Sequence, residues 1–211
     1  MLPVGVDLKR LDRLPEPQDS PGNTSINPAV DRPLILWNQR WEYDKNPGDF
    51  FDALTHVANQ GIDFKLALCG QRFSRQPKEF DIAFDRFSDR IIHTGYAEEP
   101  LYADLLRRAD VTVSTASHEF FGISIIEAIY CHTFPILPRA LSYPELLPSQ
   151  VHTDCLYDDL EGLTERLIRA LTERERATEV LGELSAAVAS FDWVRQAPDY
   201  DRRMASITTT S

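Results

Sequence analysis

The sequence predicts an α/β fold, a doubly wound parallel sheet of the Rossmann-like type, and three observations support this prediction. Short apolar runs of strand length recur through residues 34–137. Amphipathic stretches of helical length separate these runs. Strands that are joined by helices run parallel, because each crossover returns the chain to the same end of the sheet.

The apolar runs are predicted to be buried strands, and the stretches between them are predicted to be helices. Phe50, Leu54 and Val57 recur at spacings of four and three, which places them on one face of a helix. Gly61 follows this stripe, where glycine commonly ends a helix. The predicted strands are residues 34–37, 64–68, 90–93, 111–114 and 134–137, and the predicted helices are residues 49–59, 78–87, 101–109 and 123–130.

Residues 122–130, Gly-Ile-Ser-Ile-Ile-Glu-Ala-Ile-Tyr, fit two kinds of element. They are rich in β-branched residues, which are mediocre helix formers, and at a period of two they could form a strand. The flanking predicted strands favour a helix, because parallel neighbours need a crossover between them. We therefore predict a buried helix here.

The two ends of the chain differ from its repeating middle part. Residues 1–33 are predicted to be a linker segment, because five prolines lie between residues 15 and 33. Residues 34–190 are predicted to form the Rossmann-like domain, with one or two helices after residue 160. Residues 191–211 are predicted to form a tail helix, with Asp192 as its N-cap and Pro198 as an interruption.

Composition argues against several classes of protein. The chain has 211 residues and a formal net charge of −11, so it gains nothing from the counterion release that drives nucleic-acid binding. Three scattered cysteines without a CxxC pair argue against a disulfide framework and against structural zinc. No apolar run approaches the roughly 20 residues of a membrane helix, and the first residues lack a secretory signal. We expect a cytoplasmic protein that does not bind a membrane.

Residues that could bind a ligand follow two predicted strands, at the sheet edge where open α/β folds bind ligands. Arg40 and Lys45 lie five residues apart in a loop before a helix, and they could clamp a diphosphate. Glu119 and Gly122 lie at the start of a later helix, and Glu127 lies within its apolar stretch. Carboxylates accept hydrogen bonds from sugar hydroxyls, and glycine lets phosphate approach backbone amides. Ordinary alternatives stay open: solvated loop cations, a capping charge and a surface charge.

Other site motifs are incomplete or absent. His118 and Glu119 begin an H-E-x-x-H zinc motif, but Gly122 stands where the second histidine is needed. Asp199-Tyr200-Asp201 resembles a metal-binding D-x-D, but it lies in the terminal segment instead of after a strand. The sequence has no G-x-G-x-x-G, P-loop or nucleophile elbow. We therefore predict no metal and no cofactor.

The two ligand-binding loops together resemble the donor site of the GT-B glycosyltransferases related to sucrose and glycogen synthases. These enzymes carry R-x-x-x-x-K after the first strand of their C-terminal half and E-x-F-G-x-x-x-x-E-A at a later helix. Residues 40–45 and 119–128 match the two motifs in spacing and order. Residues 93–96 (HTGY) fall where the family has a nucleotide-contacting loop. The resemblance spans residues 34 to about 150 and implies the donor-binding half of such an enzyme.

A closer resemblance is to the tRNA-queuosine α-mannosyltransferases. Residues 37–47 match their W-N-x-R-W-E-x-D-K-x-P, and residues 118–122 (HEFFG) and 143–145 (YPE) match as well. Residues 2–7 (LPVGVD) resemble the segment that joins the two halves of such enzymes, which implies a chain without the acceptor-binding half. Many members have a glycine where this sequence has His132, a difference that concerns the local turn.

The resemblance implies a role for each matched residue. Arg40 and Lys45 would neutralise the departing diphosphate, Glu119 would hold sugar hydroxyls, and Glu127 would hold the ribose. The other substrate-binding residues would be His118, Phe121, Gly122, Ile123, Gly95 and Tyr96. The implied reaction is metal-independent, retaining transfer from GDP-mannose to queuosine in tRNA. The missing half, in the same or a separate chain, would bind the tRNA, and this fragment alone would be inactive.

Two other functions stay open at this point. The chain could be a non-catalytic nucleotide-binding module that pairs with a partner chain. It could also be a sugar-nucleotide epimerase of the same architecture, although the R-x-x-x-x-K clamp argues against that alternative.

Overall fold

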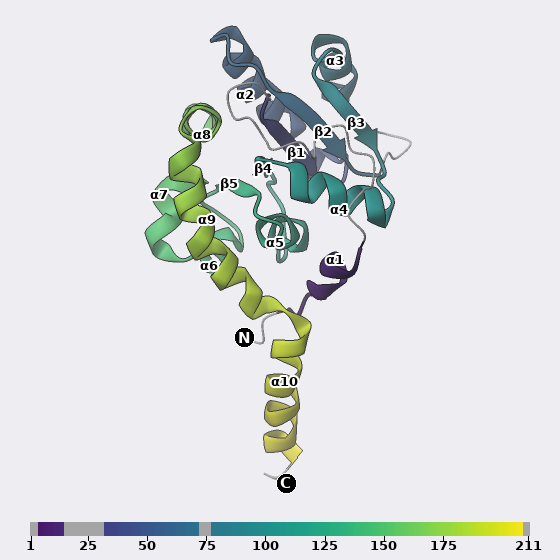
Figure 1. Cartoon of the computed structure of the whole chain (residues 1–211), viewed down its shortest axis with the longest axis vertical. Coiled ribbons are helices and arrows are strands. Elements are labelled where there is room, and N and C mark those ends of the chain that lie inside the picture. Colours follow the sequence, from purple (N-terminus) through teal and green to yellow (C-terminus); the bar gives the residue numbers. More distant parts are fainter. Residues whose placement is uncertain (1–3, 15–31, 72–76, 209–211) are drawn as a thin grey trace.

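The computed structural model describes residues 4–14, 32–71 and 77–208, and within them a six-stranded parallel sheet forms the centre (Figure 1). The strand order is β3-β2-β1-β4-β5-β6, so successive strands are added outward in both directions. This order confirms the predicted doubly wound α/β fold. The strands are β1 (Leu34–Asn38), β2 (Lys65–Cys69), β3 (Ile91–Gly95), β4 (Val111–Val113), β5 (Phe134–Pro138) and β6 (Leu156–Tyr157).

Helices connect the strands and follow the last of them. Residues 122–130, which fit two kinds of element in the sequence, form a helix as predicted, and its central residues are buried. The helices are α1 (Lys9–Arg13), α2 (Pro47–Asn59), α3 (Glu79–Arg86), α4 (Glu99–Arg108), α5 (Ile123–Tyr130), α6 (Tyr143–Leu146), α7 (His152–Cys155), α8 (Leu160–Thr172), α9 (Arg174–Val188) and α10 (Trp193–Thr208), with short 3-10 turns η1 (Tyr43–Lys45), η2 (Ser149–Val151) and η3 (Ala189–Phe191).

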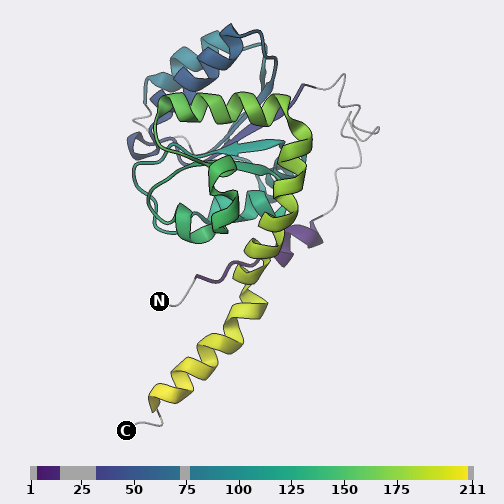
Figure 2. The ribbon, with the colours of Figure 1, turned by 90° about the vertical axis from the view of Figure 1, so that its left-hand side faces the viewer.

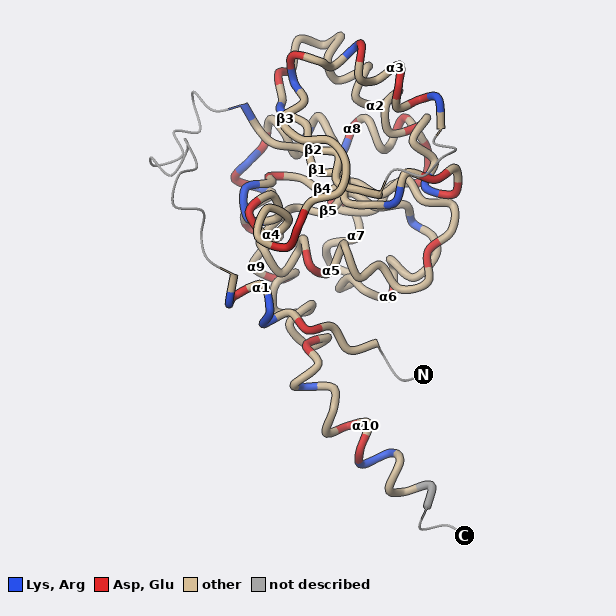
Figure 3. The backbone as a smooth tube through the Cα atoms, turned by 90° about the vertical axis from the view of Figure 1, so that its right-hand side faces the viewer, with Lys and Arg blue, Asp and Glu red and all other residues tan. Residues whose placement is uncertain are grey.

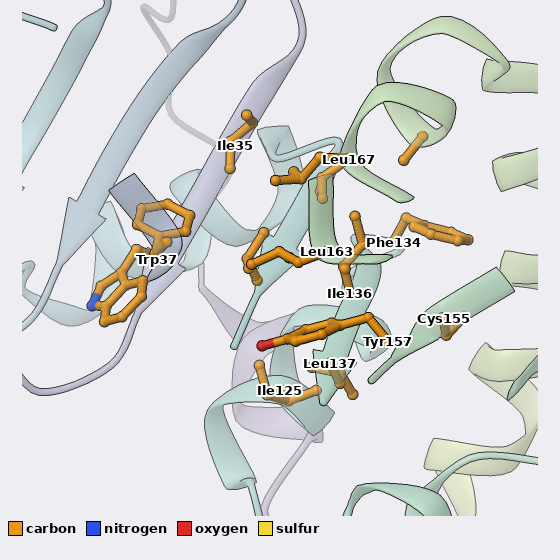
Figure 4. Close-up of a cluster of buried hydrophobic side chains, with 14 of the residues drawn as sticks. Ile35, Trp37, Ile125, Phe134, Ile136, Leu137, Cys155, Tyr157, Leu163 and Leu167 are labelled. Carbon is orange, nitrogen blue, oxygen red and sulfur yellow. The ribbon is translucent and has the colours of Figure 1, made fainter. Parts of the chain in front are cut away.

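Both faces of the sheet are covered by helices, and β1 shows how the sequence brings this about. Successive side chains of a strand point to opposite faces. Leu34 and Leu36 pack with Leu105 of α4 in one apolar cluster. Ile35 and Trp37 belong to the other cluster, which contains apolar residues of α2, α3 and α8. Figure 4 shows Ile35 and Trp37 in this cluster together with Leu163 and Leu167 of α8. Since both faces are buried, a polar ligand can reach the sheet only at the loops along its edges.

The first described residues pack against the end of the domain. The Val6 amide donates to the Phe191 carbonyl at 2.8 Å, and the Trp193 amide donates to the Val6 carbonyl at 2.8 Å. A Cβ atom on Gly5 would lie 2.0 Å from the Trp193 ring, so glycine is required for this contact. The predicted N-terminal linker therefore contains a packed segment that includes α1. Its proline-rich part, residues 15–31, lies outside the described residues.

Helix α10 projects from the body of the domain (Figure 1, Figure 2). The Val194 amide donates to Asp192 Oδ1 at 2.9 Å, which is the N-cap contact predicted for Asp192. The prediction that Pro198 interrupts this helix is wrong, because α10 continues through it. Proline cannot donate to the carbonyl four residues earlier, at Val194. Val194 is exposed, so solvent can satisfy that carbonyl and the helix tolerates the loss.

Helix α5 ends in a turn that places His132 in the left-handed region, at φ 66°. The His132 amide donates to the Ile129 carbonyl and the Thr133 amide to the Ala128 carbonyl, each at 2.9 Å. This pair of bonds is the Schellman pattern, in which glycine is favoured at the position of His132. The local turn at which the sequence differs from the resembling family is thus a position whose backbone favours glycine.

We expect His132→Gly to stabilise the fold by about 1 kcal/mol, because a side chain in the left-handed region costs about that amount. Thermal denaturation followed by circular dichroism measures the change. The matched control is His56→Gly, at an exposed position inside α2, where glycine is expected to destabilise by about 0.5 kcal/mol relative to histidine. A His132→Gly variant that melts below the parent chain would contradict the strain argument.

Candidate functional site

Trp41 anchors the loop after β1, which carries both predicted phosphate-binding cations. Its indole ring is buried and stacks on Phe80, with 4.5 Å between ring centroids and 16° between planes. Gly70 lies against it, where an added Cβ would come within 2.6 Å of Trp41 Cδ1. At the end of the loop Asn46 adopts a left-handed conformation, φ 47°, and leads into α2. The aromatic contact therefore holds this loop in place against α3.

The loop after β4 is hydrogen-bonded directly to the loop after β1. Thr115 Oγ1 donates to the Lys45 carbonyl at 2.8 Å. The Ser117 amide donates to the Asp44 carbonyl at 2.8 Å. Because β1 and β4 are neighbours in the sheet, residues that are about 70 positions apart in sequence meet at one edge. The two sequence motifs thus lie in one structural unit.

Lys45 and Glu119 form the centre of this unit. The Lys45 side chain is only 6% exposed, and its Nζ donates to the His118 carbonyl at 2.7 Å and to Glu119 Oε2 at 3.1 Å. Glu119 Oε1 accepts the amides of Phe120 at 3.0 Å and Gly122 at 3.3 Å. Glu119 therefore caps the turn before α5, which is the ordinary alternative considered for it. It also forms an ion pair with Lys45, one of the two cations predicted to bind a diphosphate. A buried ammonium requires such a charged partner.

The start of α5 lies next to this ion pair. Gly122 has φ +86°, and a Cβ there would lie 3.1 Å from the ring of Tyr143. The Tyr143 hydroxyl lies 2.8 Å from Ser114 Oγ, and this hydrogen bond holds the ring in place. The amides of Ile123 and Ser124 belong to the first turn, where no intrahelical acceptor exists. Lys45 and the positive end of the helix dipole therefore favour an anion at the same place.

Arg40 lies at the outer side of the same unit. Its side chain is 57% exposed, and Nη1 lies 3.0 Å from Glu42 Oε2. Asp44 Oδ2 lies 3.9 Å from Arg40 Nη2 and 3.6 Å from Lys45 Nζ. The two cations therefore share one carboxylate, but only Lys45 has a buried side chain. An exposed arginine can change rotamer to reach a ligand at little cost.

Glu127 belongs to a second polar network on the same helix. Its side chain is 7% exposed, Oε1 accepts from Arg10 of α1, and Oε2 accepts from the Tyr102 hydroxyl of α4 at 3.0 Å. Asn38, at the end of β1, donates to the Tyr102 oxygen at 3.3 Å. Burial, and then the charge of Glu127, raise the pKa of Tyr102 well above its usual value, so its hydroxyl stays a donor. The surface-charge alternative for Glu127 is wrong, because this carboxylate is buried and doubly hydrogen-bonded.

The family model for group 1 glycosyl transferases matches residues 23–181, which is more than half of this sequence. The chain belongs to the group 1 glycosyl transferases. This membership confirms the resemblance to GT-B enzymes that the two loop motifs predicted.

Known relatives of this glycosyltransferase include mannosyltransferases. It is 35% identical over 133 residues to the tRNA-queuosine alpha-mannosyltransferase of Drosophila melanogaster, a match that covers 63% of this chain and 34% of the relative. It is 25% identical over 203 residues to the GDP-mannose-dependent alpha-(1-6)-phosphatidylinositol dimannoside mannosyltransferase of Mycobacterium tuberculosis, a match that covers 93% of this chain and 49% of the relative. The chain thus spans half or less of these relatives.

A solved structure of the same fold is sucrose-phosphate synthase from Thermosynechococcus elongatus. It superposes with a TM-score of 0.80 at 19% identity, over 100% of this glycosyltransferase chain and 53% of that chain. At this identity the likeness shows the fold alone. None of the helices in the described ranges has the length and apolar character needed to cross a membrane.

The structure brings some predicted site residues of this glycosyltransferase together and leaves others apart. Arg40, Lys45, Glu119 and Gly122 form one unit, whereas Glu127 lies further along α5 in the network of Arg10. The His118 carbonyl accepts from Lys45 and Ile123 begins α5, but the side chains of three predicted residues make other contacts or are exposed. The exposed His118 ring packs on Phe120, the Phe121 ring packs on Phe191, and Ile123 is exposed at the start of α5.

Gly95 and Tyr96 lie at the end of β3, an outer strand two positions from β1. Gly95 has φ +99°, and the Tyr96 side chain is exposed. Strand spacing of about 4.8 Å puts them roughly 10 Å from the end of β1, at the same sheet edge as the ion pair. Their contact with a nucleotide stays a prediction of the resemblance.

Neither metal ligation nor thiol chemistry has support at this site. No three His, Cys, Asp or Glu side chains are grouped to hold a metal in the part of the chain that the structure describes. The Asp199-Tyr200-Asp201 motif lies on the projecting α10. Burial raises the pKa of the Cys69 thiol to about 12 and that of Cys155 to about 12, so both stay protonated. Metal independence of the reaction stays a prediction.

Several residues of the site were not predicted from the sequence. Thr115 and Ser117 join the two loops, while Arg10 and Tyr102 hold Glu127. Asn38 carried a usable signal, since it is a polar residue at the end of a buried strand. Arg10 carried none, because it lies 117 positions from Glu127 and within the predicted linker.

Proposed function

We propose that this glycosyltransferase domain binds the diphosphate of GDP-mannose between the Lys45–Glu119 pair and the start of α5. We further propose that the full protein transfers the mannose, with retention and without a metal, to queuosine in tRNA. The buried Lys45 ammonium beside the first turn of α5 is the observation that carries the proposal.

Lys45 has the donor capacity that a phosphate contact requires. An ammonium has three N–H donors, and two of them bond to the His118 carbonyl and Glu119. Asp44 lies 3.6 Å from Nζ, an ion-pair distance beyond hydrogen-bonding range. The third N–H of the ammonium is therefore available to a phosphate oxygen. The two existing hydrogen bonds hold this ammonium in place before a ligand binds. Such preorganised cations stabilise the charge that develops on a departing diphosphate.

Two relatives support the finer choice of donor and acceptor. One is named a GDP-mannose-dependent mannosyltransferase and the other a tRNA-queuosine alpha-mannosyltransferase. The relatives are two to three times longer than the matched region, which supports an acceptor-binding half outside these residues, in the same or a separate chain. We propose that this half contacts the tRNA, because the present chain has a net charge of −11.

We expect GDP to bind this domain more tightly than GMP by at least about tenfold, because GMP lacks the β-phosphate that Lys45 would contact. Isothermal calorimetry with GDP, GMP, UDP and ADP at fixed ionic strength measures the ranking. UDP serves as the control for the base, and GDP should exceed it. Equal affinity for GDP and GMP would rule out a diphosphate site at Lys45.

The transfer step is tested in the full-length protein with radiolabelled GDP-mannose and tRNA that contains queuosine. Labelled tRNA is the expected product, and tRNA with unmodified guanosine at the same position is the control. Label transfer to neither tRNA, in a protein that binds GDP, would support the non-catalytic alternative for this fold.

A further inference from the structure

The guanidinium of Arg10 joins three secondary-structure elements at the Glu127 network. Nη1 lies 3.1 Å from Glu99 Oε1, at the start of α4, and Nη2 donates to Glu127 Oε1 in α5. Figure 3 shows basic positions of α1 beside acidic positions of α4 and α5. Arg10 thus spans the α4–α5 interface from outside the Rossmann-like core.

Helix α1 is held firmly enough to place this side chain. Leu8 and Leu11 are buried, and the Arg107 guanidinium of α4 donates to the Leu11 carbonyl. The Tyr130 hydroxyl of α5 donates to Asp12 Oδ2 at 2.9 Å. These contacts fix the backbone on both sides of Arg10 against the two helices that its side chain joins. Its position therefore follows from packing, and is not that of a free surface arginine.

The carboxylate of Glu127 keeps acceptor capacity beyond these contacts. Each carboxylate oxygen can accept about two hydrogen bonds, and Arg10 and Tyr102 supply one to each oxygen. One acceptor position per oxygen is left, which suits the two neighbouring hydroxyls of a ribose. Because Glu127 is buried, loss of Arg10 would leave a desolvated carboxylate with a single neutral donor.

We propose that Arg10 is a positioning residue for nucleotide binding, which holds the Glu127 carboxylate in the orientation that accepts the ribose hydroxyls of the donor. This inference rests on the proposed function, because it requires a nucleotide at Glu127. Arg10 itself need not touch the ligand. Glu99 is 64% exposed and adds a second, weaker contact to the guanidinium.

The test compares GDP, 2′-deoxy-GDP and inorganic pyrophosphate by calorimetry on the parent chain and on Arg10→Gln. We expect the parent to prefer GDP over 2′-deoxy-GDP by about tenfold, and Arg10→Gln to lose most of this preference while its affinity for GDP falls by about tenfold. Affinity for pyrophosphate, which has no ribose, is expected to stay unchanged. A merely structural role would lower all affinities alike and keep the ribose preference.

Two further variants keep the result interpretable. Lys9→Gln makes the same charge change at the exposed preceding residue of α1, and it should behave like the parent. Arg10→Lys keeps the charge but cannot span Glu99 and Glu127, so an intermediate ribose preference is expected. Should Arg10→Gln have the ribose preference of Lys9→Gln, or should the parent bind GDP and 2′-deoxy-GDP equally, the assignment of Arg10 is overturned. A parent that binds no GDP overturns the proposed function itself.

Discussion

Replacing Trp41 by alanine is expected to lower the melting temperature of this domain by roughly 10 °C, from a loss of roughly 3–5 kcal/mol. Trp41 is among the largest fully buried side chains, and its ring lies between Phe80, Phe84 and Gly70. Alanine would leave a cavity that these rigid neighbours cannot fill. Because Trp41 also fixes the loop of Lys45, GDP affinity should fall together with stability.

Trp41→Phe is the matched control for this prediction. It keeps an aromatic ring against Phe80 and removes the indole N–H, which is buried without a hydrogen-bond partner among the described residues. We therefore expect a cost below about 1.5 kcal/mol, and GDP binding close to that of the parent. Thermal denaturation measures the stability of Trp41→Ala and Trp41→Phe. Calorimetry with GDP, at a temperature where both of these variants are folded, measures the effect on binding separately. If Trp41→Ala melted within about two degrees of the parent, the loop would not depend on this ring.

The predictable part of the fold is the part that local pattern determines. Strands of a parallel sheet are buried on both faces, so β1 and β2 are continuous apolar runs in the sequence. Strand β6 has only two residues and helices α6 and α7 have four each, too short for any periodicity to show. Pro198 was misjudged because the local rule ignores solvent, which can satisfy the carbonyl that proline leaves free.

The candidate site likewise has one part that the sequence predicts and another part that only the packing of the fold reveals. Lys45 and Glu119 were found through motif spacing, and their contact follows once β1 and β4 are known to be neighbours. The Arg10–Glu127 contact depends on how α1 packs on α4 and α5, which no local pattern encodes. Trp41 was noticed as part of a motif, but its function as the anchor of the loop required the position of Phe80.

Lys45→Met is expected to weaken GDP binding by about 30-fold, equivalent to about 2 kcal/mol for a charge-assisted phosphate contact. Methionine keeps much of the buried stem volume, so the apolar packing around the side chain is preserved. The loss of GDP affinity should exceed the loss caused by removing a cation that has no carboxylate neighbours, for a second reason. Without Lys45, the carboxylates of Asp44 and Glu119 would face the diphosphate with less compensation, and like charges repel.

Two comparisons decide whether this loss reflects a specific contact. Lys78→Met removes the same charge from an exposed position before α3, and it should bind GDP as the parent does. Arg40→Met removes the exposed cation of the same loop, whose charge is already shared with Glu42, so we expect a smaller loss than for Lys45→Met. The affinity for GMP should differ little between the parent and Lys45→Met, because GMP lacks the β-phosphate. Equal losses for Lys45→Met and Lys78→Met would mean that GDP responds only to net charge, and the Lys45–Glu119 ion pair would then have no part in binding the donor.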